Sequence, residues 1–501
     1  MFRKAIDEME RNVKIIDNPS FEALRKLCET EGVTTTYGSM AFRTKVKGRS
    51  AKLTEIIEGT CSKEHDRLLN KVVEYLKGKK LIKIDRRMCN KKPFHCRAYI
   101  SASYPHIAYM WTRMLFDIKK KNTKPDFISV QIPEWPKTKI IADAQSGVTF
   151  ILGSDYTGEM KKANLRMAMY RTKQRGGLGL HAGSKLIKVR DHKTKKIIEK
   201  GALLFGLSAT GKTTLTCHHH WLDKRKGEGV AIRQDDVVLM QKDSSCLGTE
   251  DNFYIKTEGL EPENQPLLYK AAISKHALFE NVTVLPDGHI DFFDETITSN
   301  GRGVVLRKEI EYTDDSVDLK RADMILFITR RKTIVPPVAK LTNEQAAAFF
   351  MLGESIGSSA SDADPGKPVR EVGTNPFIIG SKDEEGNRFY ELLKKNKHVD
   401  CYILNTGRMG MNRNDPGEKI TVHDSAVIIK EIARETVKWK KDPDWGYYVL
   451  DHCPGIDVSK FHPEKHYSKK EYQKLTKELR KERKEWLAQF KKLRKEIKNT
   501  V

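Results

Sequence analysis

The sequence Gly206-Leu-Ser-Ala-Thr-Gly-Lys-Thr-Thr214 decides the fold class of this chain. It has the complete G-x-x-x-x-G-K-[ST] pattern of a phosphate-binding loop, and it directly follows the apolar run 202–205. A strand, a glycine-rich loop and a helix start in this order direct backbone N–H groups toward a polyphosphate. Lys212 would reach the outer phosphates, and the Thr213 hydroxyl would hold Mg²⁺. The predicted nucleoside triphosphate site comprises Gly206, Leu207, Ser208, Ala209, Thr210, Gly211, Lys212, Thr213 and Thr214.

Chemically informative segments lie on both sides of this loop. Upstream is Asp155-Tyr-Thr-Gly-Glu-Met-Lys-Lys162, and His181 follows nineteen residues after its last lysine. Downstream, Asp235 and Asp236 end a short apolar stretch, where phosphate-loop proteins carry a carboxylate for the nucleotide's Mg²⁺. Two adjacent aspartates could serve two metals, because successive strand side chains point to opposite faces. Imidazole and carboxylate are ordinary Mn²⁺ ligands, whereas an amine binds a metal only if its pKa is strongly depressed.

The ordered set of motifs resembles the ATP-type phosphoenolpyruvate carboxykinase family. Residues 156–162 match that family's Tyr-x-Gly-Glu-Met-Lys-Lys segment, and His181 matches its metal-binding histidine. The phosphate loop matches at 206–215, and Gln234-Asp235-Asp236 stands for the family's Gly-Asp-Asp. Further matches follow in order at 280–284, 287–292, 300–302, 335–342, 404–407 and 419–420. The resemblance is firm from about residue 126 to residue 425.

The resemblance implies an α/β, two-domain phosphoenolpyruvate carboxykinase-like fold whose C-terminal domain is a P-loop mononucleotide-binding domain. We place an N-terminal oxaloacetate-binding domain at 1–178 and the nucleotide- and metal-binding domain at 179–458. The stretch 353–375, rich in Gly, Ser and Asp, matches the position of the family's active-site lid. A basic helical tail at 459–501 completes the expected organisation.

The same resemblance assigns roles to individual residues. It implies a reaction of oxaloacetate and ATP that gives phosphoenolpyruvate, CO₂ and ADP. The implied Mn²⁺ ligands are Lys162, His181 and Asp236, and Mg²⁺ would bind Thr213 with Asp235 nearby. The implied catalytic residues are Arg49, Tyr156, Lys161, Lys162, Lys212 and Arg302. Arg302, Lys419, Ile420 and Ser425 would also contact the nucleotide.

Several positions depart from the family pattern. Ala209 replaces a glycine of the loop, which narrows the space for backbone approach to the phosphates. Lys419 stands where the family usually has Arg, so a planar fork becomes a point charge. Arg408 follows Asn-Thr-Gly where Trp is usual, and only Gly48-Arg49-Ser50 survives of the family's substrate-binding segment. These changes concern nucleotide fit and substrate choice more than the metal site.

The chain has a net charge of +24, and much of the excess lies in the tail. Apolar residues recur there at helical spacing between lysines and glutamates, as in an amphipathic helix. They are Leu475, Leu479, Trp486, Leu487, Phe490, Leu493 and Ile497. We expect a helix docked on the protein rather than a nucleic-acid arm. A positive protein also suits anionic substrates.

Other features of the sequence narrow the class of protein. The chain has no apolar run near the roughly 20 residues that span a bilayer, and its charged start lacks a signal peptide's apolar core. The eight cysteines form no C-x-x-C pair and indicate reduced thiols. We therefore expect a cytoplasmic protein without a membrane partner. Residues 1–120 are expected to be mainly helical in short pieces, and His218-His219-His220 to be helix residues without a metal.

Two other functions stay open at this point. One is a kinase on the same scaffold that phosphorylates a different small acid or hydroxyl without decarboxylation. The other is a nucleotide-regulated RNA-binding protein in which the basic tail is the working part. The sequence also leaves open ATP against GTP or pyrophosphate, a monomer against a small homo-oligomer, and the metabolic direction.

Overall fold

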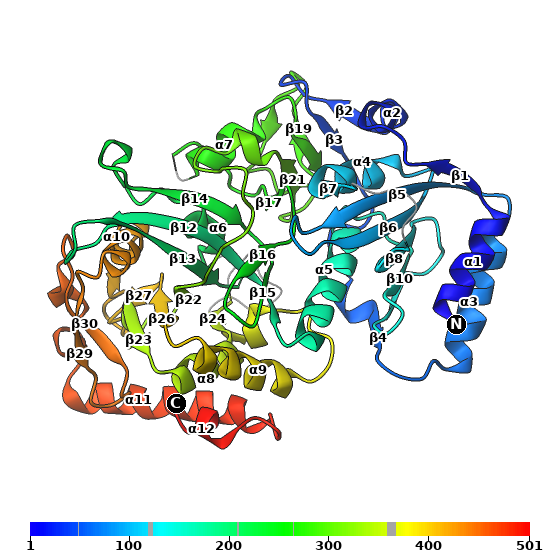
Figure 1. The fold of residues 1–501 in the computed structure, drawn as a ribbon. Coiled ribbons are helices and arrows are strands. Elements are labelled where there is room, and N and C mark those ends of the chain that lie inside the picture. Colours follow the sequence, from blue (N-terminus) through cyan, green and yellow to red (C-terminus); the bar gives the residue numbers. More distant parts are fainter. Residues whose placement is uncertain (49, 119–123, 208–209, 264, 358–366) are drawn as a thin grey trace. The chain divides into compact units, whose positions relative to one another are not determined.

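The computed structural model describes residues 1–501 except 49, 119–123, 208–209, 264 and 358–366 (Figure 1). Two compact units make up the chain. The first consists of Met1–Arg171 and Thr249–Glu311, and the second of Thr172–Gly248 and Tyr312–Val501. The mixture of helices and sheets in both units agrees with the α/β class expected from the sequence.

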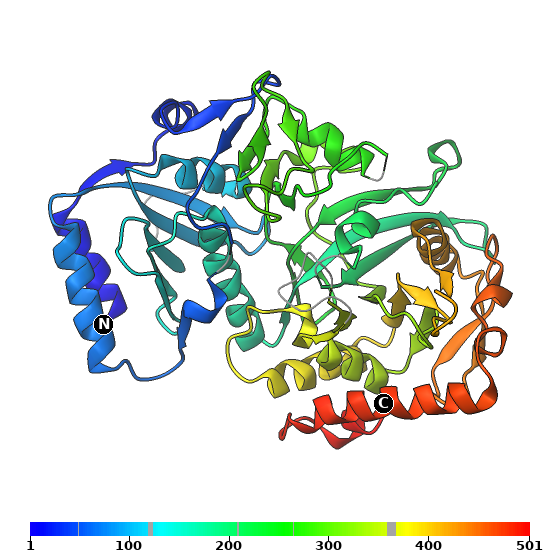
Figure 2. The same ribbon diagram turned by 180° about the vertical axis from the view of Figure 1, so that it is seen from behind.

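The first unit is built on a mixed sheet with the strand order β1-β5-β6-β8-β10-β9-β4, with β7 paired to β5. Helices α1 (Phe2–Asn12) and α3 (Lys63–Leu76) pack side by side against it (Figure 2). Helix α3 starts at a Ser62 capping box, and its buried residues follow a 3.6-residue period. The strands are β1 (Lys14–Asp17), β4 (Thr54–Ile57), β5 (Lys80–Met88), β6 (Phe94–Ser101), β7 (Phe116–Asp117), β8 (Phe127–Ile132), β9 (Lys139–Asp143) and β10 (Val148–Leu152).

Residues 249–311 belong to the first unit because their strands pair with a strand near the N-terminus. The order of this second sheet is β17-β21-β18-β3-β2, and β18 runs parallel to β3. The prediction from sequence placed 249–311 in the nucleotide domain, and the structure groups them differently. The elements are β2 (Gly32–Thr34), β3 (Met40–Phe42), β17 (Phe253–Lys256), β18 (Leu278–Glu280) and β21 (Arg302–Val305), with α7 (Pro266–Ala272) and the hairpin β19 (Thr283–Val284) and β20 (Ile290–Asp291).

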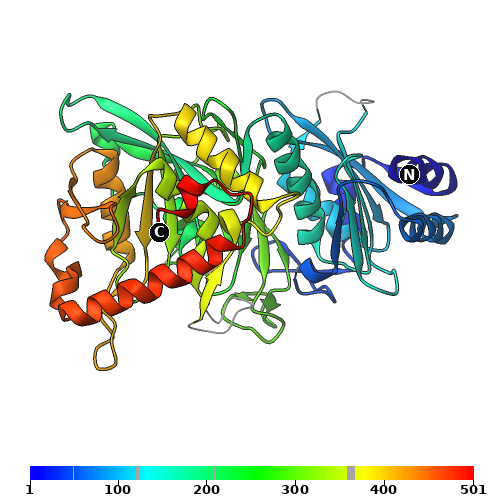
Figure 3. The ribbon, with the colours of Figure 1, turned by 90° about the horizontal axis from the view of Figure 1, so that it is seen from below.

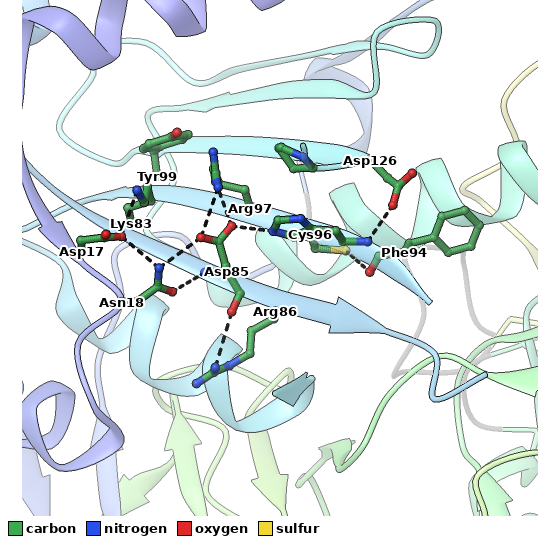
Figure 4. Close-up of polar contacts among 12 residues, drawn as sticks. Asp17, Asn18, Lys83, Asp85, Arg86, Phe94, Cys96, Arg97, Tyr99 and Asp126 are labelled. Carbon is green, nitrogen blue, oxygen red and sulfur yellow. Dashed lines mark hydrogen bonds and ion pairs between the residues drawn. The ribbon is translucent and has the colours of Figure 1, made fainter. Parts of the chain in front are cut away.

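The expectation of a mainly helical start was only partly right, because the described part of residues 1–120 contains the seven strands β1 to β7 as well as the helices α1 to α4. Strand β5 is difficult to recognise from sequence because many of its residues are charged. In the folded protein several of these charges are paired (Figure 4). The Asp85 carboxylate accepts hydrogen bonds from His95 Nε2 at 2.7 Å, Arg97 Nε at 2.8 Å and Asn18 Nδ2 at 3.1 Å. Lys83 pairs in turn with Asp17 of β1 at 2.9 Å. Charged residues can therefore occupy a strand whose other side chains are buried.

The second unit is built on a sheet with the order β14-β12-β13-β22-β26-β23-β30-β29. Strands β13, β22 and β26 are parallel neighbours in its centre, where β22 and the second half of β13 are apolar and buried. A smaller sheet has the order β11-β15-β16, and two hairpins pair β24 with β25 and β27 with β28. The main strands are β12 (Ala182–Arg190), β13 (Ile197–Phe205), β14 (Gly229–Gln234), β22 (Met324–Thr329), β23 (Val338–Leu341), β26 (Asp400–Asn405), β29 (Lys438–Lys441) and β30 (Tyr448–His452). The others are β11 (Leu178–Leu180), β15 (Val238–Met240), β16 (Cys246–Gly248), β24 (Glu354–Ile356), β25 (Pro368–Arg370), β27 (Arg408–Met409) and β28 (Glu418–Lys419).

The C-terminal tail is part of the second unit, where α11 lies along α8 (Figure 3). Its helix ends earlier than the apolar spacing predicted, at Ala488. Beyond this point, side chains of α9 accept hydrogen bonds from the backbone of the tail. Asp383 accepts from Lys492 N at 2.8 Å, and Asn387 accepts from Arg494 N at 3.1 Å. The remaining helices are α2 (Phe21–Leu27), α4 (Pro105–Met114), α5 (Thr157–Gln174), α6 (Lys212–Thr216), α8 (Asn343–Leu352), α9 (Lys382–Lys395), α10 (Val422–Ala433), α11 (Lys469–Ala488) and α12 (Lys495–Lys498). No helix within the described ranges is both long and apolar enough to cross a membrane.

Candidate functional site

The phosphate loop connects the central strand β13 to the short helix α6. Gly206 follows the strand, and a Cβ at this position would lie 2.4 Å from the Thr210 hydroxyl oxygen, so only glycine fits. Gly211 precedes the helix with φ of 92°, a left-handed conformation that glycine adopts without strain. Lys212 is the first helical residue, followed by Thr213 and Thr214. Two predicted members of the loop, Ser208 and Ala209, lie outside the described residues.

A neighbouring segment supports the loop and leads to the late nucleotide-binding candidates. The Thr406 hydroxyl donates to the Thr210 carbonyl at 2.8 Å, and Ile420 N donates to the Gly407 carbonyl at 3.1 Å. Ile420 is buried, whereas Lys419 beside it is exposed on β28. Ser425 lies buried in α10, where its hydroxyl bonds the carbonyl of Thr421, the N-cap residue. Lys419 is thus the member of this set that is accessible to a ligand.

His181 and Asp236 form the clearest metal-binding geometry in the second unit. His181 Nδ1 donates to the Thr374 carbonyl at 2.5 Å, and its Nε2 lies 3.0 Å from the Asp236 carboxylate. A protonated imidazole would donate from Nε2 to this carboxylate, and after loss of that proton Nε2 and the carboxylate oxygen could both bind one cation. Two ligand atoms at about 2.1 Å from an octahedral ion are about 3.0 Å apart, which this spacing fits. Asp235, the preceding residue, is buried.

A full cage of ordinary ligands does not accompany this pair. Among the described residues, no group of three or more His, Cys, Asp or Glu side chains gathers around one point. The third predicted ligand is Lys162, a half-buried residue of α5 in the first unit. The donor set of the second unit by itself is one imidazole and one carboxylate.

In the first unit, Asn300 joins two of the predicted catalytic residues. Its Oδ1 accepts from Arg302 Nη2 at 2.6 Å, and its Nδ2 donates to the Tyr156 hydroxyl at 3.5 Å and to the Lys47 carbonyl at 2.8 Å. Lys47 Nζ in turn donates to Asn281 Oδ1 at 2.8 Å. One amide side chain therefore orients a phenol, a guanidinium and the backbone that leads to Gly48.

Arg49 itself lies outside the described residues, but its neighbours in sequence are firmly held. The Asp155 carboxylate accepts from Lys45 N at 2.6 Å and from Val46 N at 2.9 Å. Ser50 N donates to the Glu159 carboxylate. Asp155 and Glu159 flank Tyr156, so the segment predicted to bind substrate is tied to the motif around this tyrosine.

Lys161, one of the implied catalytic residues, takes part in a buried ion pair. Its ammonium lies 2.9 Å from the Glu250 carboxylate, and both side chains are buried. This carboxylate balances the positive charge of Lys161 within the first unit. Glu250 carries no motif, and nothing in the sequence identifies it.

Lys185 is a further residue that sequence reasoning missed. It points from β12 to the end of α6, and its Nζ bonds the carbonyls of Leu215 and His218 and the Nε2 of His220. Burial lowers the pKa of Lys185 to about 7. Since β12 also carries Lys188 and Arg190, nothing in the sequence distinguishes Lys185 as a buried lysine.

The three histidines also differ from the prediction, because α6 ends at Thr216 and they follow it in a turn. His220 has φ of 57° and is fully buried. Its Nδ1 donates to the Ala426 carbonyl at 2.9 Å, which leaves Nε2 to accept from Lys185. His220 thus connects the turn after α6 to Lys185 of β12 and to α10.

Known proteins agree with the motifs and their order. A family model for phosphoenolpyruvate carboxykinase matches residues 13–459, a longer span than the one that carries the motifs. The phosphoenolpyruvate carboxykinase (ATP) of Aeropyrum pernix is 34% identical over 474 residues, covering 94% of this chain and 93% of that protein. The phosphoenolpyruvate carboxykinase (ATP) of Alkaliphilus oremlandii is 25% identical over 525 residues, covering 96% and 95%. Since the matches extend over nearly the whole chain, it belongs to the ATP-dependent phosphoenolpyruvate carboxykinase family.

Proposed function

We propose that this protein converts oxaloacetate and ATP to phosphoenolpyruvate, CO₂ and ADP. The observation that carries the proposal is the His181–Asp236 pair, which stands in the same unit as a phosphate loop. A kinase that only transfers a phosphoryl group requires the phosphate loop and its Mg²⁺. Its reaction does not require a further cation site with an imidazole ligand. Family membership supports the same reaction.

The residues of the second unit suit the handling of a nucleotide. Lys212 opens α6 and would balance charge on the phosphoryl group in transfer, while Thr213 and Asp235 are the residues that would hold Mg²⁺. The hydroxyl of Thr406 fixes the loop backbone at Thr210. Catalysis by such groups consists of positioning and electrostatic stabilisation.

The residues that fit Mn²⁺ are His181 and Asp236, with Lys162 as the third ligand that the family pattern adds. Bound there, Mn²⁺ would supply Lewis-acid stabilisation of the negative charge that develops when CO₂ leaves oxaloacetate. The hydrogen bond from His181 Nδ1 to the Thr374 carbonyl orients the ring so that Nε2 is directed toward Asp236.

The residues of the first unit suit the handling of a dicarboxylate. Asn300 holds the Tyr156 hydroxyl and the Arg302 guanidinium in one arrangement. A phenol and a guanidinium can together orient a carboxylate and stabilise charge on a transferring phosphoryl group. Arg49 would add a second guanidinium for the substrate.

The test separates the two chemical steps. Arg302→Ala should slow phosphoryl transfer far more than decarboxylation, so the ratio of pyruvate to phosphoenolpyruvate formed from oxaloacetate and ATP should rise. Lys308→Ala, a change of an exposed cation nearby, is the matched control and should leave the ratio unchanged. If the wild-type protein releases no CO₂ from oxaloacetate with any phosphate donor or metal, the proposal is wrong.

The metal assignment has its own measurement. His181→Ala and Asp236→Asn should each weaken Mn²⁺ binding, as measured by electron paramagnetic resonance, by about tenfold or more. Asp243→Asn removes one exposed carboxylate of the same unit and should not change the Mn²⁺ affinity. Unchanged affinity in both site variants would reject the shared ion.

A further inference from the structure

The C-terminal helix α11 contributes a buried ion cluster, although it lies beyond residue 459, where the family match ends. Five charged side chains meet at this cluster, from α11, from both strands of the β24–β25 hairpin and from the residues after β22. They are Glu354, Arg370, Arg331, Glu482 and Arg483. The tail is thus part of the second unit's interior in its polar contacts as well as its apolar ones.

Glu354 is the centre of the cluster and has almost no contact with solvent. Its side chain is 2% exposed, and that of Arg483 is 1% exposed. Arg483 forks onto it with Nε at 3.1 Å and Nη2 at 2.6 Å, while Arg331 and Arg370 each approach Oε2 at 3.1 Å. A pairing of this kind fixes the planes of the groups as well as their separation.

Glu482 adds the second negative charge and divides it between two guanidiniums. Its Oε1 accepts from Arg331 Nη2 at 2.7 Å and from Arg370 Nη2 at 2.5 Å. The side chain of Arg331 therefore lies between one carboxylate of the hairpin and one carboxylate of α11. Its position depends directly on the tail.

The backbone of Arg331 is bonded to the segment that supports the phosphate loop. Arg331 N donates to Asn405 Oδ1 at 3.0 Å, and Arg408 N donates to the Arg331 carbonyl at 2.8 Å. Gly407 passes so close that a Cβ there would lie 2.1 Å from this carbonyl oxygen. Between them, Thr406 donates to the Thr210 carbonyl of the loop at 2.8 Å.

These contacts form a continuous path from α11 to the phosphate loop. We propose that Glu482 and Arg483 are positioning residues for the nucleotide, acting through Arg331 and the segment 405–408 on Thr210. The proposal rests on the proposed function in that the ligand positioned is a nucleoside triphosphate. A solvated basic arm would not place an arginine and a glutamate in the interior in this way.

The experiment compares two changes on the same helix in the full-length protein. Glu482→Gln keeps the size of the side chain but removes the charge that Arg331 and Arg370 share. Leu487→Ala removes a buried apolar side chain of α11 and leaves every member of the ion cluster in place. Both loosen the tail, but only the first acts on the path to Thr210.

Glu482→Gln should raise the Kd for MgATP, measured by calorimetry, by about tenfold, within the range for mutations along a contact network. It should also speed amide hydrogen exchange in the peptide that covers α6. Leu487→Ala should lower the melting temperature and leave both the Kd and this exchange rate near wild type. The proposal is overturned if Glu482→Gln changes neither quantity, or if Leu487→Ala changes them equally.

The two arms also separate this inference from the proposed function. A wild-type protein that does not bind MgATP contradicts the proposed function, and the exchange rate of the α6 peptide then decides the positioning role by itself. A wild-type protein that binds MgATP while Glu482→Gln binds it equally well contradicts the positioning role alone.

Discussion

Asp85 in the first unit and Glu354 in the second are both buried carboxylates bonded to cations, but their partners lie at very different distances along the chain. Asp85 bonds His95 and Arg97, which are 10 and 12 residues away on the neighbouring strand. Glu354 bonds Arg483, which is 129 residues away. One cluster belongs largely to a hairpin, and the other is complete only when the C-terminal helix has docked.

The electrostatics of the two clusters are nevertheless alike. Burial raises the pKa of the Asp85 carboxyl, and the hydrogen bonds from His95, Arg97 and Asn18 outweigh this, so the pKa lies well below its usual range. Burial also raises the pKa of Glu354. The charges of its three arginines lower this pKa by more, so it too lies well below its usual range. The comparison teaches that similar pairing can be built from local or from distant sequence. The cost of breaking it should differ accordingly.

The largest effect is expected for Glu354→Gln. Arg331 and Arg370 would keep Glu482 as a carboxylate partner, whereas the buried Arg483 would lose the carboxylate it binds, so the free energy of unfolding of the second unit should fall by about 3–5 kcal/mol. Urea unfolding, with hydrogen exchange in the peptides of α8 and α11, measures the loss. Glu478→Gln, an exposed change on α11, is the control and should cost less than about 0.5 kcal/mol. A similarly small cost for Glu354→Gln would mean that water replaces the carboxylate as the hydrogen-bond partner of the arginines.

A smaller loss is expected for Asp85→Asn in the first unit. The partners that remain are an imidazole, which can become neutral, and Arg97, whose side chain is 17% exposed. The free energy of unfolding should fall by about 2–3 kcal/mol, with faster exchange confined to peptides of β1, β5 and β6. Asp117→Asn is the control, because the side chain of Asp117 is 91% exposed in its pair with Arg86. Equal losses in the Asp85 and Glu354 variants would contradict the difference drawn between the clusters.

The same comparison explains which parts of the fold could be predicted from sequence. The phosphate loop was predicted because it is a continuous pattern of a few residues. Strand β5 was missed because Lys83, Asp85 and Arg86 look like a solvated surface until their partners are known. Glu354 and Arg483 gave no signal at all, since the contacts that make them structural join residues far apart in the chain.

The candidate site followed the same division. His181 and Asp236 were predicted from family spacing, and the structure brings them together. Asn300 lies in the segment 300–302 that matches the family, but sequence reasoning assigned it no role of its own. Its hydrogen bonds to Tyr156 and Arg302 depend on three-dimensional proximity. Glu250 and Lys185 were missed because their partners, Lys161 and His220, lie on other elements.

Acid should remove the contribution of both clusters, at pH values set by the shifted carboxyls. Each folded-state pKa is depressed, so each carboxylate stabilises the protein above its unfolded pKa and loses this contribution as pH falls toward the folded pKa. The loss should begin below about pH 4.5 for Glu354 and pH 3.8 for Asp85, where the unfolded chain starts to bind protons. The slope should approach about 2.7 kcal/mol per pH unit when both titrate. Wild type minus the double variant Asp85→Asn/Glu354→Gln isolates this slope, and a difference independent of pH would contradict it.

The smallest effect is expected for Lys185, a buried basic group that can be compared with the two buried carboxylates. In the described part of the chain no carboxylate pairs with Lys185, and burial lowers its pKa to about 7 from a usual value of 10.5. Between these values the unfolded chain binds the extra proton, so the free energy of unfolding should rise with pH, by up to about 1.4 kcal/mol per unit. Wild type minus Lys185→Met, measured from pH 6 to pH 9, gives the contribution of this one group. Lys188→Met, an exposed change on the same strand, is the control and should show no such slope.

The hydrogen bonds around Lys185 could instead keep it charged, which would give the opposite result. Its Nζ faces three acceptors, the carbonyls of Leu215 and His218 and the Nε2 of His220, which match the three protons of an ammonium. If these bonds outweigh burial, Lys185 stays charged throughout, and the difference between wild type and Lys185→Met stays flat from pH 7 to pH 9. A rising difference shows instead that neutral acceptors do not replace a carboxylate. That outcome would agree with Glu354, whose pKa is lowered mainly by the full charges of Arg483, Arg331 and Arg370.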